Sequence, residues 1–209
     1  MIFGRKNKVQ KVNYNNNMEK LEDLTAKLPT WELEDEKFKK TKNEIERINK
    51  IIDIFRTVPD DKMYSEVLEF VLTFMGSPYG VFGYIDSKGT FVCPSMTRNI
   101  WDKCQMQERD IVFPRETWGK SIWGRAIIKK KVLYSNRPFK VPKGHISMLK
   151  ALMVPIIHHK KVIGLFEVAN KKTDYTKDDR DMLEQTARLI SSVLMARLQR
   201  DGILKKGGE

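Results

Sequence analysis

Two long apolar segments in the second half of the chain limit its possible folds more than any other feature. Residues 148–158 and 161–170 consist mostly of aliphatic and aromatic side chains, a composition typical of strands that are buried on both faces. The turn at residues 158–160 is too short for a crossover helix, so the two segments predict an antiparallel hairpin. We expect this hairpin to lie at the centre of a sheet.

Helices and shorter strands are expected around this hairpin. Apolar residues recur at three- and four-residue steps from Leu33 to about Thr57, which indicates a long amphipathic helix that ends before Pro59. Thr176 with Asp179 three residues later predicts a capping box at the start of a long last helix. The other expected elements are helices at 18–28, 63–75, 98–108 and 119–130 and strands at 80–86, 90–94 and 131–135.

This order of elements predicts an α+β fold in which helices pack on a central antiparallel sheet. The polar, basic residues 1–17 are expected to form a disordered tail, because they offer few apolar groups to bury. We expect residues 18–58 to form a helical extension for signalling or dimerisation. Residues 59–200 would form the globular domain, and residues 201–209 a flexible tail.

Composition argues against several classes of protein. The 39 basic and 27 acidic residues give a net charge of +12, but the lysines are scattered in short runs without a nucleic-acid-binding motif beside them. Nucleic acid is therefore not an expected partner, although a regulator that binds it through this basic surface stays an alternative.

The two cysteines suit a reducing compartment, and no apolar run reaches the ~18 residues of a membrane span. We expect a cytoplasmic protein.

An ordered set of short motifs runs from about Met63 to Leu198. It includes the segments 99–104 (NIWDKC), 123–126 (WGRA), 141–145 (VPKGH) and 162–171 (VIGLFEVANK). Through this set the chain resembles a GAF domain, in particular the variety found in bacterial and archaeal sensor histidine kinases. The resemblance covers about two thirds of the chain.

The resemblance implies a GAF-like central antiparallel sheet, with the N- and C-terminal helices packed on one face and a ligand pocket on the other. Such domains bind cyclic nucleotides, bilins, haem or small metabolites, and many are dimers joined by their terminal helices. We therefore expect a non-catalytic sensor of a two-component system. It would form a homodimer, bind a small molecule, and report occupancy through its terminal helices to a histidine kinase or another output protein.

Six residues are candidates for ligand binding. Trp101, Trp118, Trp123 and His145 fall in the segments that wall the pocket of similar domains, and Asn136 and Cys104 are further candidates for polar contacts. The indole rings could stack on a planar ligand, and the asparagine, histidine and cysteine could supply oriented polar contacts. Each has a plainer alternative, because tryptophans fill cores, a histidine can cap a strand backbone and a small buried cysteine is inert.

Cys104 and His145 also raise the hypothesis of a haem- or redox-based sensor. A thiol can attach haem or ligate a metal, and an imidazole can ligate iron. The CxxCH pattern of covalent haem attachment and the spacing of zinc ligands are both missing. We therefore expect no metal site, and haem stays an alternative cofactor.

Catalysis can be judged against an enzyme family with a similar fold. Free methionine-R-sulfoxide reductases carry cysteines in a Gly-x-x-Cys-Gly element and just after a Gly-His-Ile-x segment. Trp123 and Met148 stand at those positions in this chain. The signature of cyclic-nucleotide-binding members is matched only in part, by Asn170-Lys171 and Tyr175. No catalytic residue is therefore expected.

Overall fold

The computed structural model describes residues 31–96 and 111–205. The tail at 1–17, the expected helices at 18–28 and 98–108, and the candidate residues Trp101 and Cys104 lie outside the described residues. The chain divides into two compact units, residues 1–45 and 46–209. Helix α2 (Trp31–Thr57) runs across this boundary, and all the other described elements belong to the second unit.

The described strands form one antiparallel sheet in the order β3-β2-β1-β6-β5-β4. The predicted central hairpin is present: β5 and β6 pair from Ala151 opposite Ala169 to His158 opposite Lys161. The expected α+β fold with a central antiparallel sheet is therefore confirmed. The strands are β1 (Tyr79–Ile85), β2 (Phe91–Met96), β3 (Val112–Phe113), β4 (Leu133–Ser135), β5 (Ala151–His158) and β6 (Lys161–Ala169).

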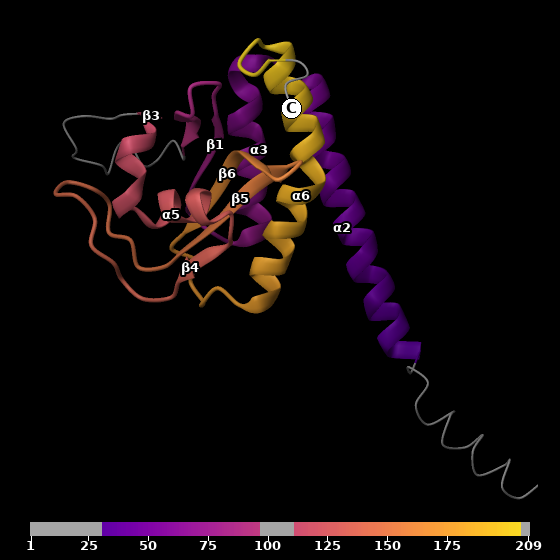
Figure 1. Cartoon of the computed structure of the whole chain (residues 1–209). Helices are drawn as coiled ribbons and strands as arrows, with labels where there is room; N and C mark the ends of the chain where they lie inside the picture. The colour runs from indigo at the N-terminus through magenta and orange to yellow at the C-terminus, as the bar shows by residue number, and fades with distance from the viewer. Residues whose placement is uncertain (1–30, 97–110, 206–209) are drawn as a thin grey trace, which may run out of the picture. The chain divides into compact units, whose positions relative to one another are not determined.

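One face of the sheet is covered by α3 (Asp60–Met75), α6 (Lys177–Arg200) and the part of α2 from residue 46 onward (Figure 1). Phe82 of β1 and Phe166 of β6 lie in this layer with no exposed surface, and their stacked rings are 4.6 Å apart. The terminal helices thus pack on one face of the sheet, as expected.

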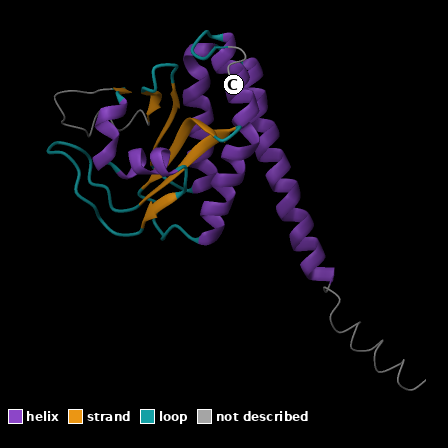
Figure 2. Ribbon diagram, viewed as in Figure 1, coloured by secondary structure: helices purple, strands orange, loops and turns teal. Residues whose placement is uncertain are grey.

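The opposite face carries a second layer, made of the 3₁₀ helix η1 (Arg115–Lys120), the short helix α5 (Ile122–Lys129) and the loop at 136–150 (Figure 2). A separate apolar cluster lies between these segments and the sheet. The sheet therefore separates this layer from the long helices.

Two predicted features are confirmed by the local structure: the tight turn between β5 and β6, and the capping box at the start of α6. His159 and Lys160 have φ angles of 42° and 65°, so both central residues of the β5–β6 turn are left-handed, as a type I′ turn requires. At the start of α6, the Thr176 hydroxyl accepts a hydrogen bond from the Asp179 amide, and the Asp179 carboxylate accepts one from the Thr176 amide. The capping box is complete.

Other boundaries differ from the sequence prediction. The expected helix at 119–130 is divided into η1 and α5, because the Ser121 hydroxyl accepts the Gly124 amide at 2.9 Å and begins a new helix. Strand β5 begins at Ala151 instead of residue 148, since the amides of Leu149 and Lys150 donate to the Asn170 side chain. Strand β3 was not predicted, because two residues carry too little pattern to be recognised.

A buried arginine connects the three helices of the first layer. Arg197 of α6 is 5% exposed, and its guanidinium donates to the Phe55 carbonyl of α2 at 3.2 Å. It also pairs with Asp60 at the start of α3 and with Asp201 at 3.0 Å. Its charge thereby has partners inside an otherwise apolar layer.

Candidate functional site

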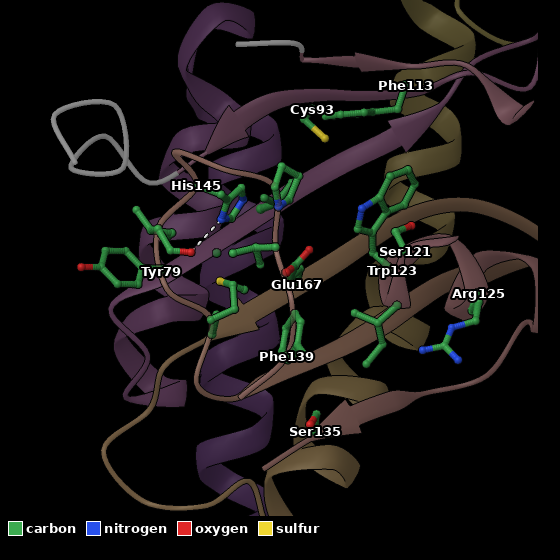
Figure 3. Close-up of a pocket in the computed structure, with 18 of the residues that line it drawn as sticks. Tyr79, Cys93, Phe113, Ser121, Trp123, Arg125, Ser135, Phe139, His145 and Glu167 are labelled. Carbon is green, nitrogen blue, oxygen red and sulfur yellow. Dashed lines mark hydrogen bonds between the residues drawn. The ribbon is translucent and has the colours of Figure 1, made fainter. Parts of the chain in front are cut away.

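A cavity of about 740 Å³ lies on the face of the sheet opposite α3 and α6. The sheet forms its floor, and η1, α5, β4 and the loop at 136–150 contribute to its walls (Figure 3). Side chains alternate along a strand, so Val81 and Glu167 line the cavity while Phe82 and Phe166 contact the helices. The predicted pocket face therefore contains a real cavity.

Three aromatic rings form one side of the cavity. Trp123, in the first turn of α5, lies 5.2 Å from the ring of Phe91 and 5.4 Å from the ring of Phe113. Phe139 adds a fourth ring from the loop at 136–150 (Figure 3). Such flat apolar surfaces suit an organic ligand.

Trp118 lies behind this aromatic side and does not line the cavity. It is only 4% exposed, and its indole N–H donates to the Phe113 carbonyl at 2.9 Å. Its ring meets that of Trp123 edge to face at 6.3 Å. Trp118 thus supports Trp123 from the core, which is the plainer of its two expected roles.

Glu167 lies at the middle of the cavity floor (Figure 3). Its neighbours across the sheet are Val81 and Met153, and neither can form an ion pair or hydrogen bond with a carboxylate through its side chain. Burial raises the pKa of the Glu167 carboxyl to about 7. At neutral pH the floor therefore carries a carboxyl group that exchanges readily between its neutral and charged forms.

Three side chains with basic nitrogens line the cavity at its edges. His145, on the loop, is half-buried, and its Nδ1 donates to the Ile146 carbonyl at 2.8 Å (Figure 3). Within the described part of the chain, this contact leaves Nε2 as the nitrogen that can accept or ligate. Arg125 and Lys140 are exposed, so they lie where the cavity meets solvent.

Cys93 is the cysteine of the described residues, and it also lines the cavity. Its side chain is 2% exposed, and burial, with a contribution from Glu167, raises the pKa of the Cys93 thiol well above its ordinary value. A thiol that resists ionisation is a poor nucleophile. Its chemistry is that of a small apolar side chain.

Asn136 is not among the residues that line the cavity. Its amide oxygen accepts the Tyr175 N–H at 2.8 Å, and its amide nitrogen donates to the Tyr175 carbonyl at 3.1 Å. The Tyr175 hydroxyl in turn lies 2.8 Å from that of Ser77, just beyond α3. Asn136 therefore joins the loop that walls the cavity to the helical layer.

The structure brings Trp123 and His145 to the cavity and places Trp118 and Asn136 beside it. Sequence reasoning missed Glu167, Cys93 and the rings of Phe91, Phe113 and Phe139. A signal for Glu167 was present, because it is the acidic residue inside an apolar strand. The phenylalanines gave no such signal, because a sequence pattern does not distinguish a phenylalanine that lines a cavity from one that fills the core.

The family of this fold is decided by similarity to known proteins. Residues 59–195 match the GAF domain family. This chain belongs to the GAF domain family. The match extends from the start of α3 through most of α6 and so includes the cavity.

A curated relative of this GAF domain is the methyl sulfide methyltransferase-associated sensor of Methanosarcina acetivorans. The two are 26% identical over 112 residues, which are 50% of this chain and 11% of that sensor. The chain therefore spans about a tenth of the relative's length.

Solved structures of other GAF domains share the fold. The domain of a Coxiella burnetii phosphoenolpyruvate-protein phosphotransferase aligns with a TM-score of 0.61 at 13% identity, covering 78% of this chain and 98% of that one. The corresponding Acinetobacter domain gives 0.58 at 13%, with 77% and 98% covered. Free methionine-R-sulfoxide reductase from Neisseria meningitidis gives 0.55 at 15%, with 75% and 91% covered.

The described part of this GAF domain contains neither a cluster of metal ligands nor a membrane span. Among residues 31–96 and 111–205, no group of three or more His, Cys, Asp or Glu side chains could hold a metal ion. No helix in those residues is long and apolar enough to cross a membrane.

Proposed function

We propose that this GAF domain is a non-catalytic sensory module that binds a small molecule in the cavity. The observation that carries the proposal is the cavity itself, about 740 Å³ in volume, with aromatic walls and a few polar groups. This combination is typical of small-molecule sites. The name of the Methanosarcina relative, a sensor, supports the same assignment.

The residues at the cavity support binding without turnover. Trp123 and Met148 line it at the positions where the sulfoxide reductases carry cysteines. Cys93 has a raised thiol pKa and is therefore a weak nucleophile. Likeness to the reductases is a likeness of fold, and function depends on the side chains at the site.

We further propose that occupancy is transmitted through the contacts between the cavity loop and the segment that connects β6 to α6. The loop at 136–150 is fixed to Tyr175 by Asn136 at one end. At the other end, Asn170 accepts the amides of Leu149 and Lys150 and donates to the Ser147 carbonyl at 2.8 Å. A ligand that moves the loop would thus bias the position of the first turn of α6.

The output would pass through a homodimer to a histidine kinase or another output protein. Phe38 and Ile45 of α2 are 70% and 56% exposed and stand seven residues apart, on one side of the helix. Exposed apolar side chains at this spacing suit a helix pair between two copies.

A thermal-shift screen of metabolites and nucleotides on the full chain tests the binding proposal. Val81→Trp would fill the cavity from its floor, while Val112→Trp places the same ring at an exposed position of the same sheet. We expect compounds that stabilise the wild type and Val112→Trp but not Val81→Trp. Compounds that stabilise all three proteins equally, or a screen without a binder, would contradict the proposal.

Haem is the second candidate ligand, because His145 lines the cavity with Nε2 available. The residue fits an axial ligand in type, and bound haem would supply gas or redox sensing. An absorbance spectrum with added haem tests this alternative. A Soret band that is lost in His145→Ala would support it, and a protein whose spectrum added haem leaves unchanged would exclude it.

A further inference from the structure

We infer that the cavity selects an organic cation, such as a methylated ammonium group, which would lie between the Glu167 carboxylate and the rings of Phe113 and Trp123. The inference rests on the proposed function and names the class of ligand for that site. It depends on three observations, namely a carboxylate without a partner in the described part of the chain, a set of aromatic rings, and the position of the competing cations.

The first observation is the isolation of the Glu167 carboxylate. Within residues 31–96 and 111–205, no side chain forms a hydrogen bond or an ion pair with it. Its cross-strand neighbours, Val81 and Met153, carry no charge. The Glu167 side chain is partly buried, and a carboxylate that loses part of its hydration is stabilised by a partner of opposite charge. A cationic ligand would supply the missing partner.

The second observation is the arrangement of the rings. Phe91, Phe113 and Trp123 lie with centroids 5.2, 5.4 and 6.3 Å apart, beside the floor that carries Glu167 (Figure 3). The face of an aromatic ring is electrostatically negative, so clustered rings attract a cation that lies over them. Rings and carboxylate thus favour the same sign of charge.

The third observation is that no cation among residues 31–96 and 111–205 forms an ion pair with Glu167. Arg125 and Lys140 line the cavity but are exposed to solvent, and the Nδ1 of His145 is bound to the Ile146 carbonyl. A cation close to the Glu167 carboxyl would lower its pKa. The pKa is instead raised, and burial is the cause. The space next to Glu167 is therefore available to a ligand's charge.

The ionisable groups that face the cavity set the expected pH dependence. Among the described residues they are Glu167 on β6, Cys93 on β2, Tyr79 on β1, Tyr134 on β4, His145 and Lys140 on the loop, and Arg125 on α5. Glu167 titrates near neutral pH, and a cation binds its charged form. Affinity for a cation should therefore rise between pH 6 and pH 8.

Three probes of nearly the same shape but different charge test the inference by calorimetric titration of the full chain. They are choline, its neutral analogue 3,3-dimethylbutan-1-ol, and the anion 3,3-dimethylbutanoate. We expect choline to bind about tenfold more tightly than the neutral analogue, and the anion to bind more weakly still. Equal affinity for choline and the alcohol, a preference for the anion, or no binding of choline would overturn the inference.

Matched variants connect this preference to the site. Glu167→Gln should remove most of the preference for choline over the alcohol, whereas Glu116→Gln, the same change at an exposed position of η1, should leave it intact. Trp123→Leu should weaken choline more than the alcohol. A preference that survives Glu167→Gln would also contradict the inference.

The two experiments distinguish failure of the cation inference from failure of the proposed function. If the metabolite screen finds ligands that Val81→Trp excludes but choline shows no advantage over the alcohol, the cavity binds small molecules and the cation inference is wrong. If the screen finds none, the proposed function itself fails.

Discussion

At the scale of single residues, Glu167 shows how burial changes a side chain's chemistry. The same carboxyl on the surface would be charged throughout the physiological range, whereas on the cavity floor its pKa is raised to about 7. The charged form is thus less stable in the folded protein than in the unfolded chain. Folding stability should then depend on pH.

The sign of this dependence can be tested with Glu167→Gln. Because the folded pKa lies above the ordinary value of 4.5, ionisation of Glu167 lowers the stability of the wild type as the pH rises from about 4.5 to about 7. The glutamine variant loses this cost, so its free energy of unfolding relative to wild type should increase by about 2 kcal/mol between pH 5 and pH 8. Urea denaturation at both pH values measures it, and an equal difference at both would contradict the assigned pKa.

The sequence predicts single residues of the site through the resemblance to GAF domains. The segments that wall the pocket of similar domains contain Trp123 and His145, and both line the cavity. The direction of a side chain is harder to predict: Trp118, five residues before Trp123, points into the core because its indole N–H reaches the Phe113 carbonyl. Such a contact depends on a turn that sequence patterns do not define.

At the scale of secondary-structure elements, the periodicity of apolar residues and the helix-capping residues predicted the long helices and the central hairpin. The β5–β6 hairpin, α3 and α6 follow from apolar patterns and from the capping box at Thr176. The late start of β5 depends on a side chain that is distant in sequence, because Asn170 accepts the amides of Leu149 and Lys150. Local patterns carry no information on such a contact. The division of residues 119–130 depends instead on the local hydrogen bond between Ser121 and Gly124.

The helical layer offers a matched test of burial. Arg197 and Arg200 both pair with Asp60, but the side chain of Arg197 is 4% exposed and that of Arg200 is 57% exposed. Arg197→Met should lower the free energy of unfolding by about 3 kcal/mol, because Asp60 and the Phe55 carbonyl lose a buried partner. Arg200→Met should change it little, because water screens the exposed pair. Urea denaturation measures both, and equal losses would contradict this account.

At the scale of the whole molecule, the proposed dimer can be tested through α2. Phe38→Glu with Ile45→Glu should convert a dimer to a monomer, because four like charges would then meet between the two helices. Lys40→Glu changes the net charge by the same amount on another side of the helix and should leave the dimer intact. Light scattering after size-exclusion chromatography gives the mass; a wild-type monomer would contradict the proposal.

The central claim, that this GAF domain binds a small ligand in the cavity opposite its long helices, is tested most directly by two-dimensional NMR of the ¹⁵N-labelled chain titrated with metabolite mixtures. The account predicts that binding mixtures shift the Trp123 indole signal and the amides of residues 141–148, followed by those at the start of α6. Binding that shifts only amides remote from the cavity, or no binding by any mixture, would contradict it.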